Sequence, residues 1–340
     1  MEHFQLKRAA DVKQALDMAT AQTSAASPAN TPSTPSTRFL AGGTTLLDLM
    51  KLDVERPAQV IDIHRLPLDK IETLDGGGVT IGATVRNADL ANHPLIKTHY
   101  PVLSQALLSG ASAQLRNMAT TGGNLLQRTR CVYFRDTATP CNKREPGSGC
   151  SAIGGFNRNL AILGTSDHCI ATNPSDMIVA MTALEATVHT ESPQAKRSIA
   201  IDDFFLLPGT TPERETSLDA GELITHVTLP APMPGNRSVY LKLRDRASYE
   251  FALASAAVVV TVSSGRIEHV RIALGGVGVK PWRSHDAEAA LLGRAPDAPA
   301  FRAAAEAALQ TARPQSQNGF KVELAKRCIQ HALTLATQTA

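Results

Sequence analysis

Four of the five cysteines lie within thirty-nine residues of one another in the middle of the chain. They are Cys131, Cys141, Cys150 and Cys169, and nine, eight and eighteen residues separate successive members. Glycine, proline and serine are frequent between them, which indicates a loop that can bend and direct four sulfur atoms toward one centre. Because thiolates are the usual protein ligands of iron–sulfur clusters, the pattern favours a cluster site.

Three other interpretations of these cysteines stay open on the spacing alone. The thiols are also compatible with two disulfides, with buried unpaired thiols, or with a zinc ion that fixes the loop. Zinc sites usually contain two close C-x2-4-C pairs, and this sequence has none. The fifth cysteine, Cys328, shares an apolar helical stripe with Leu324, Ala332 and Leu335, so we expect a core residue there.

Two glycine turns form the second group of residues suited to chemistry. Residues 40–46 (LAGGTTL) link an apolar segment to a helical pattern, and residues 119–125 (ATTGGNL) are similar. Glycine lets the backbone approach a ligand closely, and N–H groups and threonine hydroxyls bind phosphate oxygens. Two such turns can hold one pyrophosphate from both sides, although each alone is also compatible with an ordinary turn. Residues 274–278 (LGGVG) precede no helical pattern and predict a structural turn.

Composition excludes several functional classes. The 340 residues include 43% hydrophobic side chains, enough for a large core, and this length favours two domains. The formal net charge is only +3 and aromatic residues make up 4%, so nothing indicates a nucleic-acid surface. The N-terminal residues lack an export-signal pattern, and the longest apolar run, residues 251–262, is too short to cross a bilayer.

The elements around the first turn alternate between strands and helices. Residues 21–37 are rich in Pro, Ser and Thr and predict a surface insertion of low complexity. Hydrophobic patterns and cap residues predict strands at 3–6, 39–41, 60–63 and 79–83, and helices from Asp11, at 46–52 and at 101–108. This order indicates an α/β or α+β architecture.

A second block follows the proline-rich residues 230–235, which are typical of a linker. Its patterns predict strands at 238–244, 251–262 and 269–274, followed by helices at 287–292, 301–311 and 322–335. Three antiparallel strands backed by helices fit this order.

Together, the glycine turns and the cysteine loop resemble the FAD-binding (medium) subunit of the xanthine oxidase family of molybdenum hydroxylases. Residues 38–44 are similar to the first FAD motif of this family and residues 119–124 to its second. Residues 173–176 (NPSD), and 240–242 (YLK) with Arg246, are similar to two further elements. The resemblance extends over nearly the whole chain. Within the family, the cysteine insertion is similar to that of bacterial periplasmic aldehyde oxidoreductases, where it binds a [4Fe–4S] cluster.

The resemblance implies an α+β fold in two domains. Residues 1–230 would form a two-lobed FAD-binding domain of the vanillyl-alcohol-oxidase/PCMH type, which includes the insertion at 21–37 and an iron–sulfur loop at 130–170. Residues 231–340 would form a smaller domain of the CO-dehydrogenase flavoprotein type, with a three-stranded antiparallel sheet and helices.

The resemblance also implies roles for individual residues, none of them catalytic. The two turns would hold the pyrophosphate and ribityl chain of FAD, and Asp176 would accept hydrogen bonds from its hydroxyls. Ile224 would contribute backbone bonds near the flavin ring, and Lys242 a positive charge beside it. Thr45 departs from the Asn or Asp common at its position. The implied FAD-binding residues are Arg38, Phe39, Leu40, Ala41, Gly42, Gly43, Thr44, Thr45, Leu46, Thr120, Gly123, Asn124, Asp176, Ile224 and Lys242. The implied ligands of the [4Fe–4S] cluster are Cys131, Cys141, Cys150 and Cys169.

The implied function is electron transfer by the FAD subunit of a molybdenum-containing aldehyde oxidoreductase. The aldehyde would be oxidised on a large subunit with the molybdenum cofactor. Electrons would pass through the [2Fe–2S] clusters of a small subunit to FAD, and from FAD to an external acceptor. The resemblance implies a heterotrimer with no membrane span, in the periplasm by co-export with a signal-bearing partner or, alternatively, in the cytoplasm. A self-contained FAD-dependent oxidase and a zinc-stapled, non-catalytic module remain as other functional classes.

Overall fold

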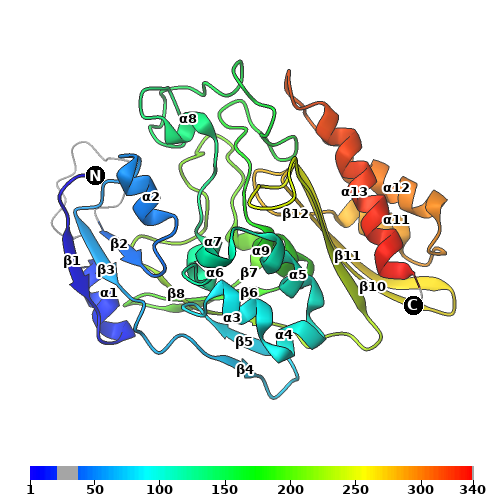
Figure 1. The fold of residues 1–340 in the computed structure, drawn as a ribbon, viewed down its shortest axis with the longest axis horizontal. Helices are drawn as coiled ribbons and strands as arrows, with labels where there is room; N and C mark the ends of the chain where they lie inside the picture. Colours follow the sequence, from blue (N-terminus) through cyan, green and yellow to red (C-terminus); the bar gives the residue numbers. More distant parts are fainter. Residues whose placement is uncertain (21–36, 339–340) are drawn as a thin grey trace.

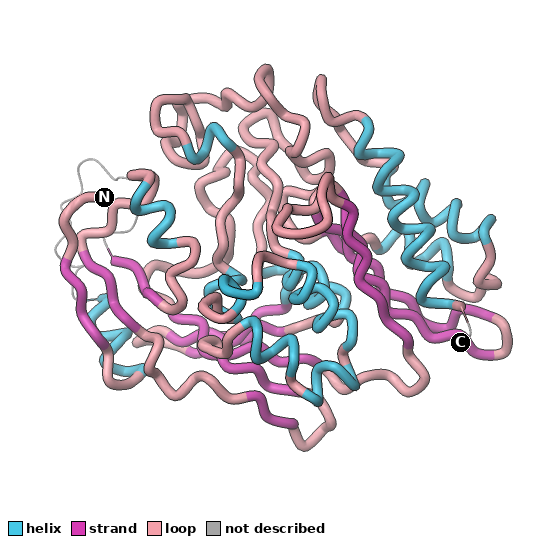
Figure 2. The backbone as a smooth tube through the Cα atoms, viewed as in Figure 1, coloured by secondary structure: helices cyan, strands magenta, loops and turns pink. Residues whose placement is uncertain are grey.

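The computed structural model describes residues 1–20 and 37–338, so the insertion expected at 21–37 lies outside the described residues except for Thr37. Three sheets organise these residues, and helices pack against each of them (Figure 1). Figure 2 shows that loops connect the sheets over the upper part of the molecule, where few helices or strands lie. In the part of the chain that the structure describes, no helix is long and apolar enough to cross a membrane.

A small parallel sheet carries the first glycine turn. Its strands are, in order, β1 (Gln5–Arg8), β3 (Gln59–Asp62) and β2 (Thr37–Leu40). Val60 and Ile61 in its central strand are fully buried, and α1 (Val12–Thr20) covers the sheet with the apolar side of an amphipathic helix. Strand β2 ends at the glycine turn, which leads directly into α2 (Leu46–Lys51).

A five-stranded antiparallel sheet forms the second lobe. Its strands are, in order, β4 (Ile71–Thr73), β5 (Val79–Gly82), β8 (Leu223–Leu229), β6 (Thr187–Glu191) and β7 (Lys196–Ala200). Ile81, Val227 and Val188 lie opposite one another on its three inner strands and are all fully buried. This apolar row fixes the register of β8, because a shift by one residue would expose its buried side chains.

Helices cover the core face of this sheet and continue into the second glycine turn. They are α3 (Asn87–Asn92), α4 (Pro94–His99), α5 (Pro101–Ser109), α6 (Ala113–Arg116), α7 (Thr121–Leu125), α9 (Asp176–Ala183) and the short α10 (Ile201–Phe204). Helix α9 is buried along its whole length, between the five-stranded sheet and the C-terminal sheet.

The C-terminal residues form a four-stranded antiparallel sheet with helices on its outer face (Figure 1). The strands are, in order, β12 (Trp282–Arg283), β11 (Arg266–Gly275), β10 (Ala254–Ser263) and β9 (Arg237–Leu243). The helices are α11 (His285–Leu291), α12 (Ala298–Leu309) and α13 (Phe320–Thr337).

Strand β10 is the central wall between the two parts of the molecule. Ala257 and Val259 face the core of the five-stranded sheet, whereas Ala256, Val258 and Val260 face α11–α13. Side chains alternate between the two faces of a strand, so a strand buried on both faces is a continuous apolar run rather than an alternating one. The C-terminal sheet is therefore packed from both sides.

The α+β fold predicted from the sequence is confirmed. The three antiparallel strands predicted for the C-terminal block are β9–β11, and the two-residue strand β12 adds a fourth. The strand predicted at 3–6 begins at Gln5, and the one predicted from Phe251 begins at Ala254. Gly276, at φ +71°, follows β11 in a turn, so residues 274–278 form no dinucleotide loop.

Residues 126–175, which contain the cysteine loop, hold a single short helix, α8 (Val132–Arg135). Fifty residues with so little regular structure are unusual in a compact domain unless they carry a function. They lie at the upper edge of the view in Figure 1, between α2 and the C-terminal domain.

Lys321 joins this long segment to α13 and to the turn after β11. Its side chain is fully buried, and its Nζ donates to the carbonyl oxygens of Leu160 at 3.0 Å and Gly276 at 2.6 Å. Burial, with a smaller effect of the charge of Arg158, lowers the pKa of Lys321 to about 7. The folded protein therefore loses this proton at a much lower pH than the unfolded chain does.

Lys321→Met should change the pH dependence of stability. Between pH 7 and the ordinary lysine pKa of 10.5, the unfolded wild type binds a proton that the folded state has lost, so wild-type stability rises with pH. The free energy of unfolding of the wild type minus that of Lys321→Met should rise with pH in this window, by at most about 1.4 kcal/mol per pH unit. Below pH 6 this difference should stay constant. Urea unfolding at pH 5 to 9 measures this, with the exposed Lys97→Met as the control. A pH-independent difference would contradict the assignment.

Candidate functional site

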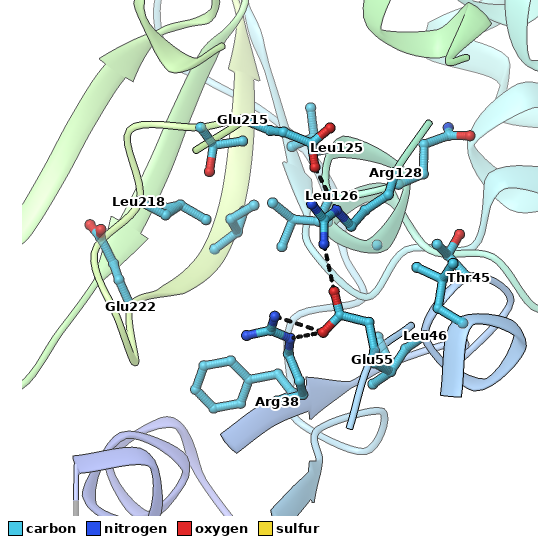
Figure 3. A pocket seen from close by; sticks show the side chains of 18 of the residues that line it. Arg38, Thr45, Leu46, Glu55, Leu125, Leu126, Arg128, Glu215, Leu218 and Glu222 are labelled. Carbon is cyan, nitrogen blue, oxygen red and sulfur yellow. Dashed lines mark hydrogen bonds and ion pairs between the residues drawn. The ribbon is translucent and has the colours of Figure 1, made fainter. Parts of the chain in front are cut away.

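A cavity of about 490 Å³ lies between the two glycine turns and the segment 205–224. This volume is within the usual range for small-molecule and cofactor sites. The first turn lies on the parallel sheet, the second turn on the five-stranded sheet, and residues 205–224 precede and begin β8. The cavity is therefore assembled from elements that are distant in the sequence, as Figure 3 shows for the labelled side chains.

The first turn presents its backbone to this cavity at the end of β2. Gly43 adopts φ +71°, a left-handed conformation that glycine reaches without a Cβ penalty. Thr45 is the N-cap of α2, and its hydroxyl makes no capping bond. The first N–H groups of a helix have no acceptor within the helix. The turn therefore offers backbone donors and two threonine hydroxyls, those of Thr44 and Thr45, toward a ligand.

The second turn uses most of its N–H groups to fix its own shape. Thr121 N donates to Val85 O at 2.9 Å and Gly122 N to Ala83 O at 2.8 Å, which ties the turn to the residues after β5. The Thr120 hydroxyl accepts a bond of 3.2 Å from Gly123 N and caps α7. The N–H groups of Thr121, Gly122 and Gly123, which we expected to bind the ligand, are thus already paired within the protein. What this turn can offer a ligand is a backbone without bulky side chains and the proton of the Thr120 hydroxyl.

The two turns touch backbone to backbone. A methyl group built at Gly42 would overlap the carbonyl oxygen of Met118, lie 2.7 Å from its carbonyl carbon and lie 3.1 Å from Cα of Ala119. Only glycine at position 42 therefore allows the turns to approach this closely.

A row of alternating charges forms one side of the cavity (Figure 3). The Glu55 carboxylate forms ion pairs with Arg38 Nη2 at 2.7 Å and with Arg128 Nη1 at 2.7 Å. Arg128 also forms an ion pair with Glu215 through its Nε, at 2.5 Å. Lys143 lies 3.0 Å from the other oxygen of Glu215. Burial acts to raise the pKa of Glu215, but Arg128 and Lys143 outweigh it and lower the pKa to about 2. The other four members of this row, Glu55, Arg128, Glu215 and Lys143, were not among the FAD-binding residues predicted from the sequence.

Most of the predicted FAD-binding residues line the cavity. These are Arg38, Phe39, Leu40, Ala41, Gly42, Gly43, Thr44, Thr45, Leu46, Thr120, Gly123 and Ile224. Asn124 lies beside the cavity lining, where its Oδ1 accepts a bond of 2.7 Å from the Ser175 hydroxyl.

Asp176 and Lys242 do not line this cavity but bind one another. Lys242 Nζ lies 2.8 Å from Asp176 Oδ2, and Tyr240 donates its hydroxyl to Asp176 Oδ1 at 2.6 Å. Both charged side chains are buried. Burial, reinforced by the charge of Asp176, raises the pKa of Tyr240 well above its ordinary value. The group joins α9 to β9, so the structure places these residues together and outside the lining of the cavity.

Cys131, Cys141, Cys150 and Cys169 converge on a second, small cavity. Cys141 and Cys150 pair in an antiparallel bridge, and Ala171 N lies 3.5 Å from Cys169 Sγ. Burial raises the pKa of the Cys131 thiol to about 11. All five cysteines are unpaired, so the structure contains neither of the two disulfides considered above. Within the described residues, no three His, Cys, Asp or Glu side chains are grouped so as to hold a single metal ion.

Cys328 lies elsewhere, as expected from its helical stripe. It is buried in the core between α13 and the C-terminal sheet, and burial raises the pKa of its thiol to about 12.

Comparison with known proteins identifies the cofactor of the domain that contains both glycine turns. Residues 2–232 match the family described as the FAD binding domain in molybdopterin dehydrogenase. Residues 239–336 match the CO dehydrogenase flavoprotein C-terminal domain. The chain belongs to the FAD-binding medium subunits of the molybdenum hydroxylase family. It is an oxidoreductase subunit, and its glycine turns are part of an FAD-binding domain.

Individual relatives of this medium subunit agree with the family. The chain is 54% identical over 308 residues to the aldehyde oxidoreductase FAD-binding subunit PaoB of Escherichia coli (strain K12), which covers 90% of this chain and 93% of PaoB. It is 30% identical to the carbon monoxide dehydrogenase medium chain of Hydrogenophaga pseudoflava, over 88% of each chain. A solved structure of that carbon monoxide dehydrogenase superposes with a TM-score of 0.75 at 28% identity, covering 98% of this chain and 97% of the other.

Gly42→Ala should damage the FAD site of this medium subunit. The added methyl group must displace the backbone at Met118, and overpacking of this kind costs about 1–3 kcal/mol. The thermal midpoint and the flavin-to-protein ratio should both fall. Gly76→Ala is the matched control, because a Cβ there meets nothing within 4 Å. A Gly42→Ala protein with wild-type flavin content would show that the two turns need not touch.

Proposed function

We propose that this medium subunit relays electrons from partner subunits to an external acceptor and does not itself oxidise the organic substrate. The observation that carries the proposal is the cavity between the two glycine turns, in a chain that spans 93% of a relative named as an FAD-binding subunit. Residues 2–232 and 239–336 match the two domains of a medium subunit, which favours an electron-transfer subunit over a self-contained oxidase.

The residues of the cavity fit FAD in both shape and chemistry. The contact of Gly42 with Met118 lets both turns come close to a pyrophosphate, and Gly123 keeps the cavity side of the second turn free of a side chain. Thr44, Thr45 and Thr120 supply hydroxyls. FAD accepts two electrons and passes them on singly or in pairs, while the protein controls its access and potential.

The partners follow from the same proposal. We expect a large subunit that carries the molybdenum cofactor and oxidises an aldehyde, and a small subunit with [2Fe–2S] clusters, in a heterotrimer. We place the complex in the periplasm, reached by co-export with a signal-bearing partner. Cell fractionation with and without that partner tests this, because the chain should stay in the cytoplasm when the partner lacks its signal.

The isolated chain should bind FAD non-covalently and show no turnover of an aromatic aldehyde. Acid precipitation should release free FAD, since neither turn contains a His or Cys for covalent attachment. Dithionite should reduce the bound flavin, and a dye acceptor should reoxidise it. The reconstituted complex, assayed beside it, should oxidise the aldehyde. Turnover by the isolated chain would favour a self-contained oxidase, and FMN or protein-bound flavin in the acid precipitate would contradict the site.

We further propose that Cys131, Cys141, Cys150 and Cys169 hold a [4Fe–4S] cluster. Support comes from four thiols that line one cavity in a loop with little structure of its own. A zinc ion needs all four ligands around one atom, whereas a four-iron cluster takes one thiolate at each iron and spaces its ligands more widely. The Ala171 N–H near Cys169 Sγ and the charge of Lys143 suit an anionic cluster.

Replacing Cys150 by Ser should remove most of the iron from the purified chain, because a cluster that loses a thiolate ligand is released readily. Cys328→Ser is the matched control and should keep wild-type iron, since its thiol lies in the core beside α13. Iron and zinc analysis with an absorption spectrum gives the result. Full iron in Cys150→Ser, or zinc in place of iron in the wild type, would overturn the cluster assignment.

A further inference from the structure

The cavity between the two glycine turns, called the flavin cavity below, shares one wall with the small cavity that the four cysteines line, called the cysteine cavity. Lys143, Cys169 and Ala171 line both of them. One of these three residues is a proposed cluster ligand, and another, Lys143, carries a charge. A change in the cysteine cavity therefore acts on side chains that also line the flavin cavity.

Lys143 reaches from the cysteine loop to the wall of the flavin cavity. Its side chain is only 9% exposed, and its Nζ donates to Pro212 O at 2.8 Å and lies 3.0 Å from Glu215 Oε1. Both partners belong to the segment 205–224 that lines the flavin cavity. This segment has little regular structure before β8, so contacts of this kind hold it in place.

The row of alternating charges connects Glu215 to the residues beside the first glycine turn. Glu215 binds Arg128 at 2.5 Å, and Arg128 binds Glu55 at 2.7 Å, beside the first glycine turn. Glu55 is only 3% exposed, so the loss of one member leaves its neighbour with a buried charge that is not compensated. The row links the segment 205–224 to the side of the cavity formed by Arg38.

The backbone of Lys143 is part of the cysteine loop itself. Lys143 follows Cys141 by two residues, and Asn142 between them bonds Gly149 N at 2.8 Å and His168 O at 3.1 Å. These bonds fix the backbone of Lys143, whose side chain lines the cysteine cavity with the four cysteines. The position of its ammonium group therefore depends on how the four cysteines are held.

We propose that Lys143 is a positioning residue that couples the two sites, so that FAD binds more tightly when the cysteine site is occupied. Occupation fixes the loop, the loop fixes Lys143, and Lys143 holds Glu215 in the cavity wall and bonds Pro212 of the same segment. The proposal rests on the proposed function. Coupling between sites is reciprocal, so bound FAD should also slow the loss of iron.

The test is a double-mutant cycle on the full chain with FAD affinity as its readout. Flavin fluorescence gives the FAD dissociation constant for wild type, Cys150→Ser, Lys143→Met and the double variant. Each single variant should weaken FAD binding by about tenfold, a typical coupling. The double variant should be no weaker than either, because the second change removes a connection already broken. Lys143→Arg should stay within about threefold of wild type, since a guanidinium also donates to two oxygens.

A second readout follows the reverse direction. Iron release to a chelator should be faster from flavin-free than from flavin-bound wild type, and this difference should disappear in Lys143→Met. Lys326→Met is the matched control, because Lys326 pairs with Glu306 between the outer helices α13 and α12, lines neither cavity and should change neither quantity. If Cys150→Ser fails to accumulate, oxidative removal of iron from the wild type gives the same comparison.

The outcomes separate this inference from the proposed function. Two outcomes overturn the coupling alone. The first is an FAD affinity that does not change after iron loss. The second is a double variant that binds FAD about a hundredfold more weakly, because the effects of Cys150→Ser and Lys143→Met then multiply as independent effects do. A wild-type chain without FAD overturns the proposed function, and one without iron overturns the cluster assignment together with the coupling.

Discussion

The FAD site depends on one steric condition, the absence of a side chain at Gly42. The first turn belongs to the parallel sheet and the second to the five-stranded sheet, so Gly42 is the point at which the two lobes touch through backbone atoms. Close approach allows two sets of backbone and hydroxyl groups to face one ligand. The second turn can keep its own shape because its N–H groups bond Val85 and Ala83. One turn is thus rigid, and the other supplies the free donors.

Electrostatics completes the cavity where backbone contacts do not reach. Arg38, Glu55, Arg128, Glu215 and Lys143 alternate in sign, and each inner member has opposite charges on both sides. Burying a charge costs free energy that one partner seldom offsets, so a row with two partners for each inner charge is better balanced than separate pairs. The pKa of Glu215 at about 2 expresses this balance, because two cations outweigh its burial. The row fixes the wall of the cavity and leaves one positive charge in excess, because three cations alternate with two anions.

Local signals in the sequence were enough for the turns and for much of the fold. Both glycine turns could be predicted because two adjacent glycines stand next to threonines in each, and β10 because burial on both faces leaves a nearly continuous apolar run. The charge row could not be predicted, since Glu55 and Glu215 meet Arg128 only after folding. Asp176 and Lys242 were chosen as separate groups beside FAD, yet they neutralise one another between α9 and β9. No one-dimensional pattern reveals such a pairing.

The long cysteine loop is anchored to two parts of the protein by side-chain bonds in its middle, since it has little regular structure of its own. Toward the C-terminal domain, Asn157 bonds Gln317 N at 3.0 Å, and Lys321 bonds Leu160 O. Toward the flavin cavity, Lys143 bonds Pro212 and Glu215. Two thiols precede these anchors in the chain, one lies between them and one follows them, in a loop whose only helix is α8. Ordering each residue of such a loop costs about 1–2 kcal/mol of conformational entropy. A ligand shared by four thiols is the kind of crosslink that reduces this cost, and its effect would then pass through Lys143 into the wall of the flavin cavity.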